Sequence, residues 1–377
     1  AFTCFRLMSR KMMREKNYTL STSVCAALVF TAFLGLSGCG GERQNDEPVL
    51  TDATLATALR QVTDNSIVPA VDTFAQASSS MSADIEAFCS DISADSLTQV
   101  QDGWRTLAQA WYRVSPYLFG PVNDDVVFPD YLYIDSLRQR GNNYLATVRT
   151  DISTMVEGAF ELDGSYFSTK EFNKVGILAL EVALFETRSG LPSNDDLLTE
   201  YRDEPRKCDV IRGLNNIVAG YSSNMQTEWT TDYQNTGTSY RDLFLAGDTE
   251  DGSEPLTLLL TRAQEHLDYL KQRSVSSVAA TVSGETWVLM QATLEAVEAI
   301  VAGTGNSGVS FYQLMNSAGQ STAVTTVQEN FARAYEAIRD KNTTDFNTAC
   351  ALLDGNFKRD IPDALAVQLG INFSDGD

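Results

Sequence analysis

The sequence predicts an all-α protein built from helical bundles. Apolar residues recur at helical spacing through most of the chain, and no long stretch alternates with the period of two that marks a half-buried strand. Glycine and proline separate the periodic segments, where they end one helix before the next begins. In the first segment Leu55, Leu59 and Val62 share one face, and Pro69 is expected to kink or restart the helix.

The second element is a helix over residues 96–117 with an aromatic face. Trp104, Leu107, Ala108 and Trp111 follow one another at i, i+3, i+4 and i+7, so both tryptophans are expected in the core. A Pro-x3-Gly-Pro sequence then ends the helix.

Further helices are expected over residues 131–157, 169–185 and 208–229, and the second of these is apolar enough to be buried on all sides. Residues 231–255 are rich in Gly, Thr and Asp and are expected to link two domains. The helical pattern then resumes over residues 256–272, 285–301, 310–317 and 322–339. The expected organisation is an N-terminal bundle over 51–230 and a C-terminal bundle over 256–377.

Residues 1–38 are expected to be a lipoprotein signal peptide, with translation starting at Met12 or Met13. A basic region precedes an apolar run over residues 21–36, which is shorter than the roughly 20 residues that span a membrane. The sequence Leu-Ser-Gly-Cys then ends at Cys39, whose thiol is expected to receive the lipid. An ordinary signal peptide with a chance cysteine is the alternative.

The predicted location follows from this leader. The mature chain is expected to begin at Cys39 and to continue through a polar tether over residues 39–50. Gly40, rather than an aspartate, resembles the pattern of lipoproteins sent to the outer membrane, so the protein is expected to face the periplasm.

The composition argues against nucleic-acid binding. The chain carries 28 basic and 50 acidic residues, a formal net charge of −22, which repels phosphate. Cations and cationic partners would be attracted, although solubility alone also explains the charge. Cys89, Cys208 and Cys350 remain after Cys39, so at most one pair can form within a monomer, and their spacings do not suit a zinc site.

Four segments together resemble the imelysin family of exported helical proteins. They are the Cys-spacer-tryptophan-helix region at residues 87–122, the sequence GILALE at 176–181, RKCDVIRGLNNIVAGY from Arg206, and LGINFSDGD from Leu369. The resemblance spans essentially the whole mature chain. It implies two helical-bundle domains with a site between them. The family is named for a peptidase activity, and other members belong to iron-uptake systems.

The family's G-x-H-x-x-E signature is altered in this chain. Gly176 and Glu181 match it, but Leu178 stands where the histidine belongs, and leucine neither ligates metal nor moves a proton. The one histidine, His266, is far away in the sequence and is expected to be a surface residue. Metal-dependent hydrolysis usually needs at least three protein ligands, so a peptidase activity is disfavoured.

The expected ligand site combines Gly176 and Glu181 with Arg113 and Glu285. A carboxylate between Leu180 and Val182 needs a partner, and Arg113 is the expected one; helix capping is the alternative for Arg113. Glu285 opens a helix, where capping is the stronger interpretation.

Two further expectations follow from the resemblance. It implies a disulfide between Cys89 and Cys208, both in the first half. The other is a metal ion, with iron expected at Glu181. The carboxylates of Asp375 and Asp377 suit a hard cation such as calcium by their own chemistry, and simple solvation of the two aspartates is the alternative.

The leading functional hypothesis is therefore a lipid-anchored envelope protein that binds a small ligand or metal complex between two bundles, linked to iron uptake. A metallopeptidase with carboxylate ligands is the first alternative. A structural or adaptor lipoprotein that binds another envelope protein is the second.

Overall fold

The computed structural model describes residues 48–123, 128–138, 141–304 and 308–369, and within these ranges the regular structure is helical with no strand. The all-α prediction is confirmed. The described residues belong to one compact unit that starts at Glu47. No helix in these ranges is long and apolar enough to cross a membrane.

The helices up to residue 230 are α1 (Asp52–Val62), α2 (Val68–Ser90), α3 (Ala94–Val114), α4 (Tyr131–Ile134), α5 (Leu145–Glu157), α6 (Gly164–Phe167), α7 (Gly176–Phe185), α8 (Asn194–Asp203) and α9 (Arg206–Thr230). A π-helical turn, η1 (Thr63–Ile67), joins α1 to α2, and short 3-10 turns lie at η2 (Gly120–Val122), η3 (Ser136–Arg138) and η4 (Phe172–Lys174).

The later helices are α10 (Tyr240–Ala246), α11 (Pro255–Gln272), α12 (Thr286–Ala302), α13 (Phe311–Ser317), α14 (Ser321–Arg339), α15 (Thr343–Gly355) and α16 (Ile361–Ala364). A 3-10 turn, η5 (Val275–Ser277), follows α11, and a second π-helical turn, η6 (Asn356–Asp360), follows α15.

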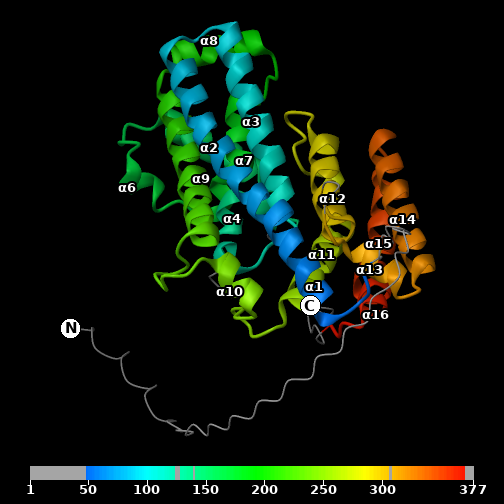
Figure 1. Cartoon of the computed structure of the whole chain (residues 1–377). Coiled ribbons are helices and arrows are strands. Elements are labelled where there is room, and N and C mark those ends of the chain that lie inside the picture. Colours follow the sequence, from blue (N-terminus) through cyan, green and yellow to red (C-terminus); the bar gives the residue numbers. More distant parts are fainter. Residues whose placement is uncertain (1–47, 124–127, 139–140, 305–307, 370–377) are drawn as a thin grey trace, which may run out of the picture. The chain divides into compact units, whose positions relative to one another are not determined.

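Helix α2 packs lengthwise against α3 and α9, while α15 packs against α11 and α14 (Figure 1). Helix α12 contacts both α3 and α14, so it joins the two groups of helices. As predicted, Trp104 and Trp111 are buried in the core, and Trp111 lies against Phe74 of α2. The expected linker contains α10, whose Tyr240 packs edge-on against Trp229 of α9. The division into two domains stays a prediction.

Two predicted helices are shorter than expected. The single helix over 131–157 is wrong, because α4 ends at Ile134 and α5 begins only at Leu145. Gly141 takes a positive φ of 66° in the break, and an unbroken right-handed helix excludes that conformation. The helix expected from residue 169 begins at Gly176 instead.

Candidate functional site

Gly176 sets how closely α7 approaches α4. It has a φ of 81°, and a Cβ at this position would lie 2.3 Å from the main-chain oxygen of Ile134. Trp104 of α3 fixes the same end of α7, since its Nε1 donates to the Ile177 oxygen at 2.9 Å. Gly176 therefore supports the site through the backbone.

Glu181 lies on α7 with only 2% of its surface exposed. Its Oε1 accepts hydrogen bonds from the backbone N and from Oγ of Ser283, both at 2.8 Å. Burial raises the pKa of the Glu181 carboxyl to about 7, and the hydrogen bonds from Ser283 oppose that rise. The sequence prediction of a buried carboxyl is confirmed, but its fixed partner is a serine 102 residues away.

The expected pair of Arg113 with Glu181 is wrong. Arg113 donates from Nη1 to Glu295 of α12 at 2.7 Å. Each residue of an α-helix turns the side chain by about 100°, so Arg113 points roughly 200° away from Trp111 and from the face that packs toward α7. Arg113 is also partly exposed, which suits a surface ion pair.

Glu181 lines a small cavity of about 20 Å³ between α3, α7, the loop after α4 and the loop before α12. Its polar lining also includes Tyr112, Asp135 and Asn143. We call this space the Glu181 cavity. The volume is sufficient for about one water molecule, for which roughly 10–15 Å³ is the minimum. Leu178, at the position expected to carry histidine, also lines it.

Asp135 is a second buried carboxyl at this cavity, and the sequence analysis missed it. Its Oδ2 accepts from Nε1 of Trp111 at 3.2 Å, and its Oδ1 accepts from the backbone N of Leu137 at 3.1 Å. Burial raises the pKa of Asp135, whereas the hydrogen bond from Trp111 and the positive charge of Arg138 both act to lower it. The available signal was an acidic residue within the apolar sequence YLYIDSL.

The expectation that His266 is a surface residue is wrong, because only 2% of it is exposed. It lies on the face of α11 that carries Leu259, Ala263 and Leu270, all of them buried. The prediction was misled by Glu265, which is partly exposed beside it.

Hydrogen bonds fix the tautomer of His266. Nδ1 lies 3.1 Å from Nη1 of Arg138, which is always a donor, so Nδ1 accepts. Nε2 therefore carries the hydrogen and donates to Oγ1 of Thr293 at 2.7 Å, and Thr293 is 3.2 Å from Oγ of Ser115. Burial, and then the charge of Arg138, hold the pKa of His266 well below its usual range. His266 is a neutral connector between α3, α11 and α12.

Glu285 precedes α12 but its side chain does not cap the helix. Its Oε1 accepts from Nε of Arg105 on α3 at 2.7 Å, and Arg105 also lies over the ring of Phe185. Glu285 therefore stands at the N-cap of α12, as expected, but its carboxylate bridges α12 to α3 instead of forming a capping hydrogen bond. Glu285 does not belong to the lining of the Glu181 cavity.

The cysteine pair implied by the resemblance is present. Cys89 at the end of α2 and Cys208 at the start of α9 form a disulfide with a Cα–Cα distance of 5.8 Å. Cys350 is a buried free thiol on α15. The lipidation residue Cys39 and the carboxylates of Asp375 and Asp377 lie outside the described residues.

The described residues contain no group of three or more His, Cys, Asp or Glu side chains placed to hold a metal ion. The Glu181 cavity instead has two carboxyls, a phenol and an amide. These oxygen donors can bind a proton or contact a hard cation, but they do not form the histidine-containing site of a zinc peptidase.

Comparisons with known proteins agree with this fold. The imelysin family model matches residues 67–369, which is most of the chain. No curated protein matches the chain.

Two solved structures share the architecture. An imelysin-like protein from Psychrobacter arcticum 273-4 is 16% identical, with a TM-score of 0.65 over 85% of this chain and 98% of that one. A protein described as an iron-regulated protein A precursor from Parabacteroides distasonis is 12% identical, with a TM-score of 0.60 over 85% of this chain and 97% of that one. At these identities the likeness concerns the fold.

Proposed function

The chain belongs to the imelysin family, and we propose that it is a cell-envelope binding protein that takes a small cation at the Glu181 cavity. One observation carries the proposal. Glu181 is buried at this cavity and is held by Ser283 rather than by a cationic side chain. A buried carboxyl of this kind keeps a proton near neutral pH, and a cation can take the place of that proton.

The size and chemistry of the cavity favour a single ion over a metal complex. About 20 Å³ leaves room for one water-sized occupant. Glu181 and Asp135 supply two carboxyls, with Tyr112 and Asn143 as neutral oxygen donors beside them. Hard cations prefer oxygen ligands. Two carboxylates are few for a permanently bound metal, so the cation is cargo rather than a resident cofactor.

Iron is the first cation to test. A solved structure with the same fold is described as an iron-regulated protein A precursor. The strongly acidic chain would raise the local concentration of cations. Leu178 at the signature histidine position disfavours the peptidase activity for which the family is named. The proposed location is the outer membrane, facing the periplasm and anchored by lipid on Cys39.

Calorimetry on the purified protein tests the cation site. Fe²⁺ under anaerobic conditions, Mg²⁺, Ca²⁺ and Zn²⁺ would be titrated into wild type, Glu181→Gln and the control Glu298→Gln, whose carboxylate accepts from Tyr335 elsewhere. We expect binding of one ion with proton release in wild type and Glu298→Gln, and loss of binding in Glu181→Gln. No binding of any cation, or equal binding by Glu181→Gln, would contradict the proposal.

A cleavage assay on the same purified protein distinguishes a binding protein from a peptidase. Wild type would be incubated with a denatured protein substrate, with and without a chelator. We expect no cleavage by the protein. Chelator-sensitive cleavage that disappears in Glu181→Gln would replace the binding proposal with a peptidase that uses carboxylate ligands.

A further inference from the structure

A second candidate site lies where the first long helix changes its hydrogen-bond pattern. Pro69 has no N–H to donate to the main-chain oxygen of Asn65, four residues earlier. The chain forms the π-helical turn η1 here, and Thr304, beyond the end of α12, donates from Oγ1 to that oxygen at 3.1 Å. π-helical turns inside α-helices are frequent at functional sites. This contact holds the segment after α12 against the first helix.

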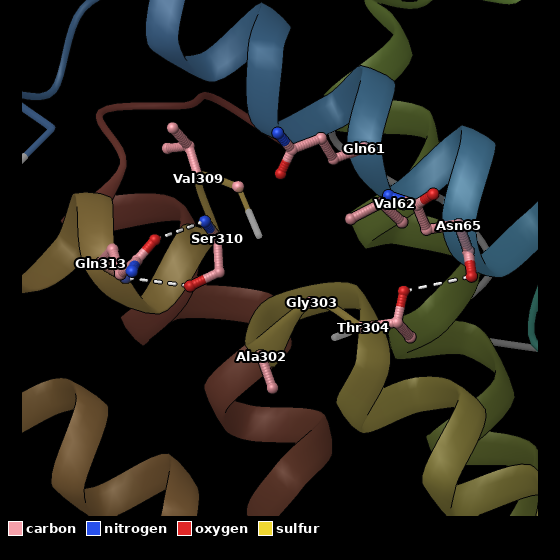
Figure 2. Close-up of a pocket in the computed structure, with 10 residues that line it drawn as sticks. Gln61, Val62, Asn65, Ala302, Gly303, Thr304, Val309, Ser310 and Gln313 are labelled. Atoms are coloured by element: carbon pink, nitrogen blue, oxygen red, sulfur yellow. Dashed lines mark hydrogen bonds between the residues drawn. The ribbon is translucent and has the colours of Figure 1, made fainter. Parts of the chain in front are cut away.

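A groove with a volume of about 270 Å³ lies beside this contact, and Figure 2 shows the residues that line it. We call it the amide groove. Its polar lining consists of Gln61, Asn65, Thr304, Ser310 and Gln313, and Val62 and Val309 add apolar surface. No ionisable side chain belongs to the part of the lining that the structure describes. The described lining therefore offers no ion-pair partner to a charged ligand, whereas its hydrogen-bonding groups match those of an uncharged polar one.

Several hydrogen-bonding groups of the groove are free to bind a ligand. Among the described residues, the side-chain amides of Gln61 and Asn65 form no hydrogen bond. Gln313 and Ser310 cap α13 through their oxygen atoms and backbone nitrogens, which leaves the NH₂ group of Gln313 available (Figure 2). Gly308 accommodates the Gln61 amide, because a Cβ at Gly308 would lie 1.9 Å from Oε1 of Gln61.

The chemistry of the lining indicates the ligand class. A side-chain amide both donates and accepts, as do the hydroxyl and acetamido groups of a sugar. The valine side chains can pack against C–H faces and a methyl group. The volume is near the lower limit of ligand pockets, about 300 Å³, which suits one sugar unit better than a drug-sized molecule. We propose that the amide groove binds an uncharged N-acetylated amino sugar.

This site is independent of the Glu181 cavity, with which it shares no lining residue. Isotope-edited NMR titration of the full protein tests it with N-acetylglucosamine as the probe. Glucosamine, which is cationic, and a neutral capped dialanine peptide serve as competing chemistries. We expect saturable shifts at residues 61–65, 303–304 and 310–313 with N-acetylglucosamine, and much weaker ones with the other two probes.

Variants locate the site. Gln61→Leu combined with Asn65→Leu should weaken N-acetylglucosamine binding at least about tenfold, since two hydrogen-bonding groups are lost. Gly308→Ala should weaken it too by displacing the Gln61 amide. Gln328→Leu, on the exposed face of α14, and Glu181→Gln should leave it unchanged.

The outcomes are distinct. Absence of any shift in wild type, or unchanged binding in the double variant, would overturn the proposal. Stronger binding of the capped peptide would identify the groove as a peptide site and overturn the sugar assignment. Because the wild-type shift map needs no variant, the test does not depend on how well the variants fold.

Discussion

Glu181 and Glu186 lie five residues apart at α7 and are almost equally buried, with 2% and 5% of their surfaces exposed. Their partners differ. Glu186 receives two hydrogen bonds from the guanidinium of Arg149, whereas Glu181 accepts hydrogen bonds from the backbone and side chain of Ser283 and from the backbone of Val282. One carboxylate is neutralised by a cation, and the other is left to bind a proton.

Other charged side chains near Glu186 also form ion pairs. Lys207, whose side chain is 1% exposed, pairs with Glu200 at 2.5 Å, and Arg188 pairs with Glu204. We call these side chains, with Arg149 and Glu186, the α8–α9 ion network. The Cys89–Cys208 disulfide lies next to it in the sequence. Burial alone therefore does not distinguish these two carboxyls; the presence or absence of a cationic partner does.

The largest expected effect comes from breaking the α8–α9 ion network. Glu200→Ala leaves the Lys207 ammonium buried without its ion pair, and burial already lowers the pKa of Lys207. We expect the free energy of unfolding at pH 7 to fall by about 3–5 kcal/mol. Chemical denaturation of the variant and wild type measures this. A loss below about 1 kcal/mol would mean that the network is no more than a surface feature.

The next effect concerns the pH dependence that Glu181 confers. Its pKa is raised from 4.5 to about 7, so its contribution to stability is complete below pH 4.5 and is lost as the pH rises through 7. Between pH 4.5 and 7 the free energy of unfolding of wild type should therefore fall by about 3 kcal/mol more than that of Glu181→Gln. Denaturation curves from pH 4.5 to 8 check this. Parallel pH profiles for the two proteins would remove the distinction between Glu181 and Glu186.

The effect of His266 on the pH dependence of stability should be opposite to that of Glu181. Its folded-state pKa lies well below 6.5, so its contribution is complete above pH 6.5 and is lost as the pH falls. Below pH 6.5 we expect the free energy of unfolding of wild type to fall, relative to that of His266→Gln, by up to about 1.4 kcal/mol per pH unit. Glutamine is the chosen replacement because it can keep both hydrogen bonds and does not titrate. Denaturation between pH 7 and 5 measures the slope. Equal slopes would show that His266 takes up a proton freely.

The smallest effect is expected for Arg113→Ala. The Arg113–Glu295 pair is well exposed, so its removal should lower the free energy of unfolding by less than about 1 kcal/mol. Cation affinity at the Glu181 cavity should not change. A large loss of affinity in calorimetry would restore Arg113 to the ligand site and weaken the contrast between compensated and uncompensated carboxyls.

The sequence was sufficient for the fold class because helical periodicity is local. The face of Trp104 and Trp111 and the burial of α7 followed from spacing and apolar content alone. The polar helix α8 escaped prediction, since it buries only Leu197, Leu198 and Tyr201.

Partners across the molecule could not be predicted in this way. Ser283 reaches Glu181 from a loop, where side-chain direction has no periodicity. Asp135 was not predicted as a site residue because a continuous helix was expected through the break after α4. The Arg113 prediction failed because it used sequence position near the tryptophan helix and ignored the helix face.

The most direct test of this account is the titration of Glu181 itself, followed by carboxyl ¹³C NMR on protein labelled at glutamate, with Glu181→Gln to assign the signal. We expect a midpoint near pH 7 in the absence of added cations, because Glu181 is buried without a compensating charge. A midpoint near 4.5, the ordinary value for a glutamate, would show that Glu181 is ionised at neutral pH, and would contradict its role as a proton-occupied cation site.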